Sequence, residues 1–381
     1  MERIYVDHAA TTPMHPEVID KMIEVMKNEF GNPSSIHSFG RRARRILDEA
    51  REILARSIGA SADEIILTSG GTEADNLALF GAARAMKEKG KHIITTAVEH
   101  HAVLHACRQL EKEGFEVTYL PVNENGVISP DDFHAALRDD TILVSVMYGN
   151  NETGALQPVA EIGEALRGHQ ALFHCDAVQA YGLEDIDVHE LNIDLLAVSA
   201  HKINGPKGSG FLYAGKKVRL MPLFFGGEQE RKRRAGTENV AAAAGFAAAV
   251  EIIQREKDER REKYGRLKQL LVEELTKQNV EFMVNGNHEK GLPHVINICF
   301  PGTDVEAMLV NLDLAGIAAS SGSACTAGSI HPSHVLVAMF GKDSERLRSS
   351  IRFSFGLNNT EEQVKKVARE TATIVRRLTG N

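Results

Sequence analysis

Residues 195–208 read LLAVSAHKINGPKG, an apolar stretch followed by a histidine, a lysine and a glycine-containing turn. The first five residues have the composition of a strand that is buried on both faces. A lysine placed directly after such a strand is partly desolvated, so Lys202 loses its proton more easily and can attack a carbonyl group. From this segment alone, an ordinary surface lysine is the alternative.

Strand-like and helix-like runs alternate on both sides of this stretch. Amphipathic segments such as 73–89, and a helix that begins at Ser129, lie between the expected strands. This alternation predicts an α/β fold with a mostly parallel sheet covered by helices. Together with 195–199, the strands are expected at 65–68, 92–98, 116–121, 142–147, 171–175 and 210–214.

The 381 residues suffice for a large α/β unit and a smaller one. A long helix over 238–278 changes from apolar to strongly charged, which indicates that it leaves the large core. We expect a large domain of residues 15–258 and a smaller C-terminal α/β domain of residues 1–14 and 259–381. The helices before residue 65 are expected to divide between the two. The smaller domain should contain strands at 295–300 and 350–355 and helices at 304–315 and 361–378.

Composition restricts the class of protein. Hydrophobic residues make up 43% and charged residues 25%, as in soluble globular proteins, which excludes a disordered chain and a disulfide-stapled miniprotein. A net charge of −8 argues against nucleic-acid binding by bulk charge.

The four cysteines form no CxxC spacing, so we expect no metal site and a reducing compartment. The longest apolar run, 241–250, is too short for a membrane span, which favours a cytoplasmic protein without a membrane partner.

Residues 68–76 read TSGGTEADN, and they follow a strand and open a helix. Glycines allow a ligand to approach the backbone, and free amides at a helix start attract anions. The segment is therefore a candidate phosphate cup around Gly71 and Thr72. It matches neither GxGxxG nor GxxxxGK[ST], so dinucleotide and nucleoside triphosphate binding are not indicated. A plain strand–helix turn is the alternative.

Residues 173–179 read FHCDAVQ and place Asp176 at the end of a buried strand. A buried carboxylate requires a cationic partner, for which a protonated pyridine nitrogen would serve, although a helix cap is the alternative. A phosphate cup, an acid and a desolvated lysine in this order are the groups that pyridoxal 5'-phosphate (PLP) requires. The combination of Gly71, Asp176 and Lys202 therefore predicts PLP as the cofactor.

Two further segments carry chemistry. Residues 319–328 read ASSGSACTAG, a run of small residues in which we expect Cys325 to be exposed on a mobile loop and nucleophilic, a buried cysteine being the alternative. Residues 349–354 read SSIRFS, where Arg352 points away from its apolar neighbours and can pair with a substrate carboxylate or with an internal acid. The remaining cysteines are expected to be packing residues.

Taken together, these segments make the chain similar to the NifS/IscS-type cysteine desulfurases, which have the PLP-dependent transferase fold of aspartate aminotransferase. The resemblance runs nearly from end to end. Besides the segments above, it rests on DHAATTP at 7–13, GNPSS at 31–35, Glu99-His100, NNETG at 150–154 and residues 226–237.

The resemblance implies a role for each matching residue. Lys202 would hold the cofactor covalently, and Asp176 would pair with its ring nitrogen. Gln179 would bond the ring hydroxyl, and His100 would stack on the ring and transfer protons. Thr237 would reach the phosphate of the other subunit, which implies a homodimer. The remaining phosphate contacts would be Gly71, Thr72, Ser199 and His201, with Asn151 also beside the cofactor.

The resemblance also implies a reaction. Asn151 and Arg352 would orient the carboxylate of L-cysteine, and Cys325 would take its sulfur as a persulfide while L-alanine leaves. An acceptor protein would then receive the sulfur for tRNA thiolation or iron–sulfur cluster assembly. The cysteine segment resembles the family branch with a longer, flexible loop. In the best-known housekeeping members of this family, a longer tail after the residue that matches Arg352 helps to dock an iron–sulfur scaffold. The stretch after Arg352 is shorter here, which argues against that scaffold and leaves a tRNA-thiolation acceptor as the other expected partner.

Two alternatives remain open from the sequence. A selenocysteine lyase or a β-eliminating lyase would use the same fold, and a β-eliminating lyase would release pyruvate instead of alanine. A catalytically silent binding subunit is the third interpretation, against which the intact Lys202, His100 and Cys325 argue.

Overall fold

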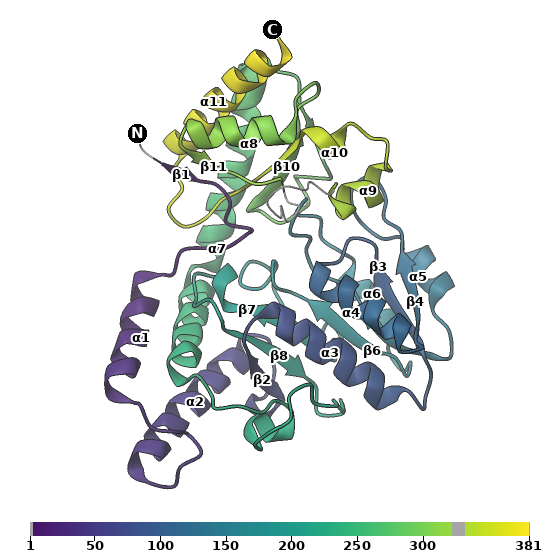
Figure 1. Cartoon of the computed structure of the whole chain (residues 1–381), viewed down its shortest axis with the longest axis vertical. Helices are drawn as coiled ribbons and strands as arrows, with labels where there is room; N and C mark the ends of the chain where they lie inside the picture. The colour runs from purple at the N-terminus through teal and green to yellow at the C-terminus, as the bar shows by residue number, and fades with distance from the viewer. Residues whose placement is uncertain (1–2, 322–331, 381) are drawn as a thin grey trace.

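The computed structural model describes residues 3–321 and 332–380 and comprises two units along helix α7 (Val240–Lys277), which runs from one into the other (Figure 1). The larger unit contains a seven-stranded sheet in the order β2-β8-β7-β6-β5-β3-β4. Only β8 is antiparallel to its neighbours, so the predicted mostly parallel sheet is confirmed. Its strands are β2 (Ile65–Thr68), β3 (His92–Thr96), β4 (Glu116–Leu120), β5 (Thr141–Ser145), β6 (Leu172–Asp176), β7 (Leu195–Ser199) and β8 (Gly210–Ala214).

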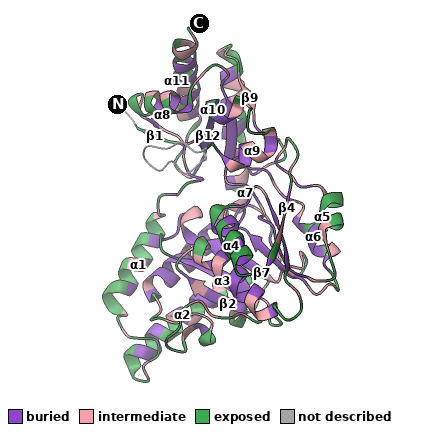
Figure 2. Cartoon of the chain, turned by 45° about the vertical axis from the view of Figure 1, so that its right-hand side comes forward, coloured by how far each residue is buried: buried purple, intermediate pink, exposed green. Residues whose placement is uncertain are grey.

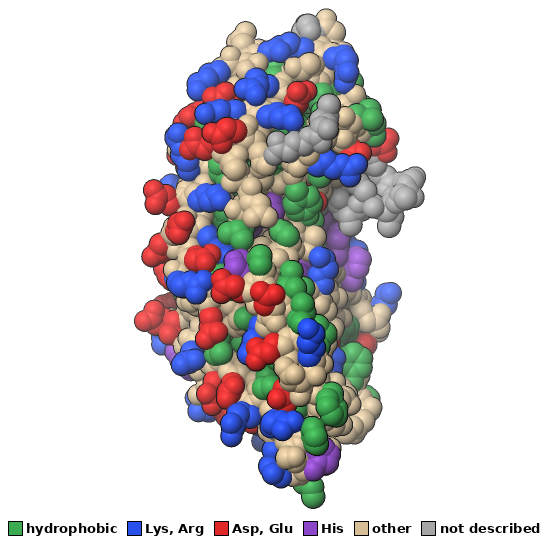
Figure 3. Space-filling view, turned by 90° about the vertical axis from the view of Figure 1, so that its left-hand side faces the viewer, with side chains coloured by type: hydrophobic (Ala, Val, Ile, Leu, Met, Phe, Trp, Pro, Cys, Tyr) green, Lys and Arg blue, Asp and Glu red, His purple; other side chains and the backbone are tan. Residues whose placement is uncertain are grey.

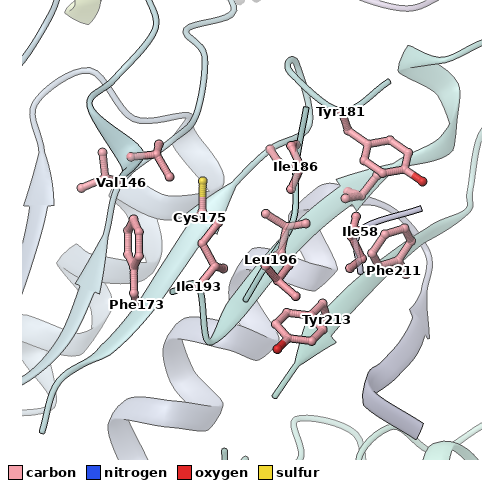
Figure 4. Close-up of a cluster of buried hydrophobic side chains, with 14 of the residues drawn as sticks. Ile58, Val146, Phe173, Cys175, Tyr181, Ile186, Ile193, Leu196, Phe211 and Tyr213 are labelled. Carbon is pink, nitrogen blue, oxygen red and sulfur yellow. The ribbon is translucent and has the colours of Figure 1, made fainter. Parts of the chain in front are cut away.

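Helices cover both faces of this sheet. One face packs on α3 (Gly71–Met86) and α4 (His101–Lys112), with Leu143 and Leu195 in the shared core. The other face packs on α5 (Pro130–Ala136), α6 (Val159–Ala165) and the first half of α7. On strand β6, Phe173 and Cys175 point into the core on the side of α5, α6 and α7 (Figure 4). The intervening His174 and Asp176 therefore face α3, since side chains alternate along a strand.

The smaller unit has its own core around the second half of α7. Its strands β9 (Met283–Val284), β10 (Val295–Cys299) and β12 (Ser350–Ser354) form an antiparallel sheet. The short strands β1 (Ile4–Tyr5) and β11 (Ile317–Ala318) pair in parallel beside it. Figure 2 shows the buried strands of this unit beneath its helices. These helices are α8 (Val305–Leu314), α9 (His334–Phe340), α10 (Arg346–Ser349) and α11 (Glu361–Thr379).

The expected division of the first helices between the two units was wrong. Both α1 (Pro16–Asn28) and α2 (Ser38–Arg56) pack on the first half of α7 in the larger unit. The reason is the alanine-rich surface of α7, against which Val25 and Ala43 lie closely. Only the segment before α1 joins the smaller unit, through β1. The domain boundaries at 14/15 and 258/259 stay a prediction.

Three short 3₁₀ turns complete the described elements: η1 (Ala62–Glu64), η2 (Ala200–Lys202) and η3 (Gln229–Lys232). In the part of the chain that the structure describes, no helix combines the length and the apolar character that crossing a membrane requires. Cys107, Cys175 and Cys299 are buried and unpaired, which confirms them as packing residues.

The core of the larger unit yields a stability prediction. Phe246 on α7 is fully buried, with its ring 5.6 Å from that of Phe211 on β8. Replacing Phe246 by Ala should lower the free energy of unfolding by about 3–5 kcal/mol, because the side-chain contacts are lost and a cavity remains. Urea denaturation followed by circular dichroism measures this loss. Leu314→Ala, at a position that is 74% exposed, is the control and should change little. Equal losses in the two variants would contradict the assignment of the core.

Candidate active site

A pocket of about 360 Å³ lies where three parallel strands of the large sheet end. Met147 follows β5, Asp176 ends β6 and Ser199 ends β7, so each strand delivers a residue to its wall. Ligands bind at the carboxyl ends of such strands in α/β proteins. The pocket contains most of the residues predicted from the sequence: Gly71, Thr72, His100, Asn151, Asp176, Gln179, Ser199, His201, Lys202 and Arg352.

The start of α3 forms one end of the pocket. Gly70, which precedes the helix, has a φ of 152°, and no side chain caps the first turn. A Cβ atom on Gly71 would lie 2.7 Å from Cγ2 of Val178, so only glycine lets the chain pass there. Helix α3 therefore presents its N-terminal amides to the pocket beside Ser199 and His201, which suits a phosphate group.

Asp176 lies on the floor of the pocket. Its Oδ1 accepts a hydrogen bond of 2.9 Å from the amide of Val178 in the turn that follows β6, and no helix begins there, so the alternative of a helix cap does not hold. Burial raises the pKa of Asp176 to about 6, and the Val178 amide and the charge of Lys202 act against that rise. The carboxyl group is therefore ionised at neutral pH and can pair with a cation in the pocket.

Lys202 reaches the pocket from η2, directly after β7. Its Nζ donates to the carbonyl oxygen of Ala10 at 2.9 Å and also to that of Ala9. Burial is the main cause that lowers the pKa of Lys202 to about 8, and the charge of Arg352 adds to it. The surface-lysine alternative is thus excluded, and a sizeable share of the amine is neutral near physiological pH.

His100 caps the first turn of α4. Its Nδ1 accepts a hydrogen bond of 3.1 Å from the amide of Ala102, so the ring proton lies on Nε2. Burial, and then the charge of Lys202, lower the pKa of His100 to about 4. The imidazole at the pocket wall is therefore neutral and has one N–H donor that its capping role does not use.

Arg352 and Asn151 lie on the opposite wall. The guanidinium of Arg352 donates to the backbone oxygen of Asn151 at 2.8 Å and to Oδ1 of Asp7 at 2.7 Å. Its Nε is buried without a hydrogen-bond partner in the described structure. Arg352 thus forms the internal ion pair that was one alternative from the sequence, and the second hydrogen on each of its terminal nitrogens can still serve the other alternative, a substrate carboxylate.

Three further predicted residues differ in where they lie. Gln179 donates from Nε2 to the Ala9 oxygen at 2.9 Å, and its Oε1 lies 3.2 Å from Nε2 of His294. Thr237 lies outside the pocket, exposed on the segment before α7. Cys325 lies outside the described residues.

Some residues at the pocket were not predicted from the sequence. Asp75 lines it from the second turn of α3, and Asp7 holds Arg352. His294, from the smaller unit, orients Gln179. Asp75 stands within the TSGGTEADN segment, and Asp7 within DHAATTP, so both lay in quoted motifs. No sequence pattern marks His294, because it comes from a loop that only the folded chain brings to the pocket.

The residues present fit PLP. A helix start free of side chains matches a phosphate, a buried ionised carboxyl matches a protonated ring nitrogen, and a partly neutral lysine matches an aldehyde. All three line a single pocket.

Comparison with known proteins gives the same result. The family model described as Aminotransferase class-V matches residues 4–367. The chain belongs to the class-V aminotransferase family. A Bacillus subtilis (strain 168) protein that carries the name IscS 1 is 62% identical over 379 residues, and the match covers 100% of both chains. A protein of Dictyoglomus turgidum named cysteine desulfurase IscS is 47% identical and covers 98% of this chain and 95% of its own. A protein of the same name from Methanosarcina thermophila is 48% identical, covering 98% and 92%.

Solved structures agree with this family. A NifS-like protein superimposes with a TM-score of 0.92 at 34% identity and covers 98% of this chain and 100% of its own. A structure described as SspA in complex with cysteine has a TM-score of 0.82 at 35% identity, covering 92% and 98%. The predicted family and the PLP-dependent transferase fold are confirmed. Class-V aminotransferases are PLP-dependent enzymes, so the predicted cofactor is confirmed as well.

The environment of Lys202 predicts how PLP uptake depends on pH. Only a neutral amine attacks an aldehyde, and Lys202 becomes neutral as the pH rises through its lowered pKa of about 8. The rate at which the cofactor-free chain takes up PLP, followed by visible absorbance, should therefore rise with pH and level off above about 8.

Variants test this assignment. Lys202→Ala should abolish the absorbance change. Lys207→Ala, at an exposed lysine five residues further along the chain, should leave it unchanged. A rate that keeps rising towards the ordinary lysine pKa of 10.5 would contradict the desolvated environment.

Proposed function

We propose that the chain is a cysteine desulfurase, which converts L-cysteine to L-alanine and retains the sulfur on Cys325 as a persulfide. The observation that carries this proposal is the joint placement of Lys202, Asp176 and Arg352 around a single pocket. Relatives from Dictyoglomus turgidum and Methanosarcina thermophila bear the name cysteine desulfurase, which supports the same reaction here.

In this proposal the large unit holds the cofactor. Lys202 binds PLP covalently, and Asp176 pairs with the ring nitrogen. The amides of Gly71 and Thr72 bind the phosphate together with Ser199 and His201. Gln179 is suited to bond the ring hydroxyl, because Ala9 occupies only one of the two hydrogens of its amide nitrogen. When bound, PLP supplies an electron sink for the reacting carbon atoms.

Arg352 and Asn151 orient the substrate. Arg352 lines the pocket, and each of its two terminal nitrogens, which donates once to Asn151 or to Asp7, keeps a second hydrogen that can bind a carboxylate oxygen of L-cysteine. Asp7 and the Asn151 oxygen fix the guanidinium plane, so the arginine loses little side-chain freedom on binding. The arrangement selects small amino acids with a free carboxylate.

Protons are moved by two groups in this proposal. The Lys202 amine has a lowered pKa of about 8, so it can accept and return a proton near neutral pH. His100 keeps its ring proton on Nε2, because Nδ1 is occupied by the Ala102 amide, and it can donate that proton within the pocket. The carbonyl oxygens of Ala9 and Ala10 hold Nζ in place between these events.

The chain connects the pocket directly to Cys325. Ser320 lines the pocket, and its backbone pairs with that of Arg352. Cys325 follows Ser320 by five residues in the sequence, and five residues span at most about 18 Å. Its thiolate attacks the sulfur of cysteine and the carbon–sulfur bond breaks. The sulfur stays on Cys325, and the three-carbon product takes up protons and leaves as L-alanine.

An acceptor protein then removes the sulfur. We propose a tRNA-thiolating enzyme or an iron–sulfur scaffold as this acceptor, in line with the sequence resemblance. Direct transfer of the persulfide sulfur to either class of protein, followed with ³⁵S-labelled cysteine, decides between them.

We also propose that the active unit is a homodimer. Ile19, Ile23 and Met26 form an exposed apolar stripe along α1. Figure 3 shows hydrophobic side chains exposed among charged ones over the lower half of this face. Phe224 and Phe225 are also exposed, on the segment that leads to Thr237. Side chains of this kind are usually covered by a partner, and a second copy would also bring Thr237 to the other phosphate site.

The first test of the function follows the sulfur. After incubation with L-cysteine and PLP, intact-mass analysis should show a gain of one sulfur atom, with L-alanine released in parallel. Cys325→Ser should abolish both the mass gain and the turnover. Cys299→Ser is the control and should retain both, because Cys299 is buried against Ser349 and a hydroxyl preserves that contact.

Pyruvate as the product would indicate a β-eliminating lyase instead. Neither product in a protein that binds PLP would indicate a silent subunit.

The second test concerns the shared site. Lys202→Ala and Thr237→Ala homodimers should both bind PLP poorly or not at all. A mixed dimer of the two variants contains one site with both residues intact, provided that Thr237 serves the partner's site. It should therefore regain about half of the PLP absorbance per dimer. Absence of any recovery in a verified mixed dimer would place Thr237 in the site of its own subunit, and normal PLP binding by the Thr237→Ala homodimer would place it in neither site.

A further inference from the structure

A layer of buried polar side chains lies under the pocket, on the face of the sheet that α3 covers. His174 and Asp176 point to this face from β6, and Ser145 pairs with His174 from the neighbouring strand β5. Asp75 approaches from α3 and lines the pocket floor. All four side chains are buried, yet none belongs to the core of hydrophobic contacts.

Asp75 and His174 face one another in this layer. Oδ1 of Asp75 lies 3.5 Å from Nε2 of His174, and neither atom has a hydrogen-bond partner among the described residues. Nδ1 of His174 lies 2.8 Å from the hydroxyl of Ser145. Because buried polar atoms are rarely left unpaired, this geometry indicates that Asp75 and His174 share a hydrogen through a small side-chain movement.

The charge balance decides where that hydrogen lies. Three buried carboxyl groups, those of Asp75, Asp176 and Glu99, interact electrostatically with one another. Glu99 is fixed at Oε1 by Thr96 and by the amide of Met147, both at 2.9 Å. Three carboxyl groups that are this close together and buried away from solvent cannot all be ionised.

The surrounding groups support a neutral pair. Burial raises the pKa of Asp75 well above its ordinary range and lowers that of His174 to about 3, so both favour their uncharged forms. Burial also raises the pKa of Glu99 to about 8. Among the described residues, the positive charge of Lys202 favours the ionised form of one of these acids, Asp176, because it lowers the pKa of that carboxyl group. Cys175 adds no negative charge, because burial and the same acids raise the pKa of its thiol and keep it protonated.

We propose that Asp75 is a positioning residue: it stays protonated beneath Asp176 and donates from Oδ1 to Nε2 of His174, so that Asp176 alone carries negative charge toward the cofactor's ring nitrogen. His174 then carries its own hydrogen on Nδ1 and donates it to Ser145. The inference rests on the role proposed above for Asp176, and it adds the reason why that carboxyl group is the ionised one of the three.

The test compares two substitutions at one position. Asn can donate a hydrogen bond as the protonated acid does but never ionises, so Asp75→Asn should keep kcat/KM within about threefold of the native value. Asp75→Ala removes the donor and leaves Nε2 of His174 buried and unpaired, so kcat/KM should fall about tenfold or more. If Asp75→Asn falls as far as Asp75→Ala, a negative charge on Asp75 is required and the inference is wrong.

A second readout needs no activity. Infrared difference spectra of the full chain without cofactor, native minus Asp75→Asn, should show the carbonyl stretch of a protonated carboxylic acid at pH 7. Glu99→Gln is the matched control and should remove a different band. A carboxylate band in place of the acid band for Asp75 would overturn the inference.

The cofactor role of Asp176 and the protonated state of Asp75 can be contradicted independently. The pH dependence of the visible absorbance of bound PLP should change in Asp176→Asn and remain native-like in Asp75→Asn. If Asp176→Asn leaves that dependence unchanged, the cofactor role of Asp176 fails, although the acid band of Asp75 still stands.

Discussion

The hydrogen bonds of the Lys202 amine to the carbonyl oxygens of Ala9 and Ala10 connect the parts of the molecule that form the pocket. Lys202 follows strand β7 of the large sheet, whereas the chain just before Ala9 pairs with the smaller unit through β1 and through Asp7. The segment between them therefore spans both units at the pocket wall. Its carbonyl groups hold the amine without supplying a negative charge. As a result burial dominates, and the pKa of Lys202 stays low enough for the amine to react.

The same segment links the amine to the groups around it. Ala9 also accepts from Gln179, whose other end meets His294 of the smaller unit. Asp7 orients Arg352 on β12, and the Arg352 backbone pairs with Ser320, where the chain leads towards Cys325. Cofactor, substrate and thiol are thus positioned by one continuous set of contacts, which explains why the pocket lies between the two units and not within either of them.

Much of this was predictable from the sequence, for physical reasons. Apart from the partly exposed edge strand β4, the strands of the large sheet are buried on both faces, so their apolar runs stand out between amphipathic helices. Site residues that directly follow a strand, such as Asp176 and Lys202, were found because strand ends meet at one edge of a parallel sheet. The sequence failed where packing partners decide the outcome. Helices α1 and α2 carry apolar stripes that would fit either unit, and the alanine surface of α7 fixed their position. Asp75 and His174 resemble ordinary helix and strand residues until the fold buries them against one another.

The central claim is that Lys202 is the residue that carries the cofactor. Borohydride reduction fixes PLP permanently on the lysine that holds it, and peptide mass spectrometry then locates the label. The account predicts a phosphopyridoxyl group on the peptide that contains Lys202 and on no other lysine. A label on the exposed Lys207 or on the buried Lys268 of the smaller unit, with Lys202 unmodified, would contradict it.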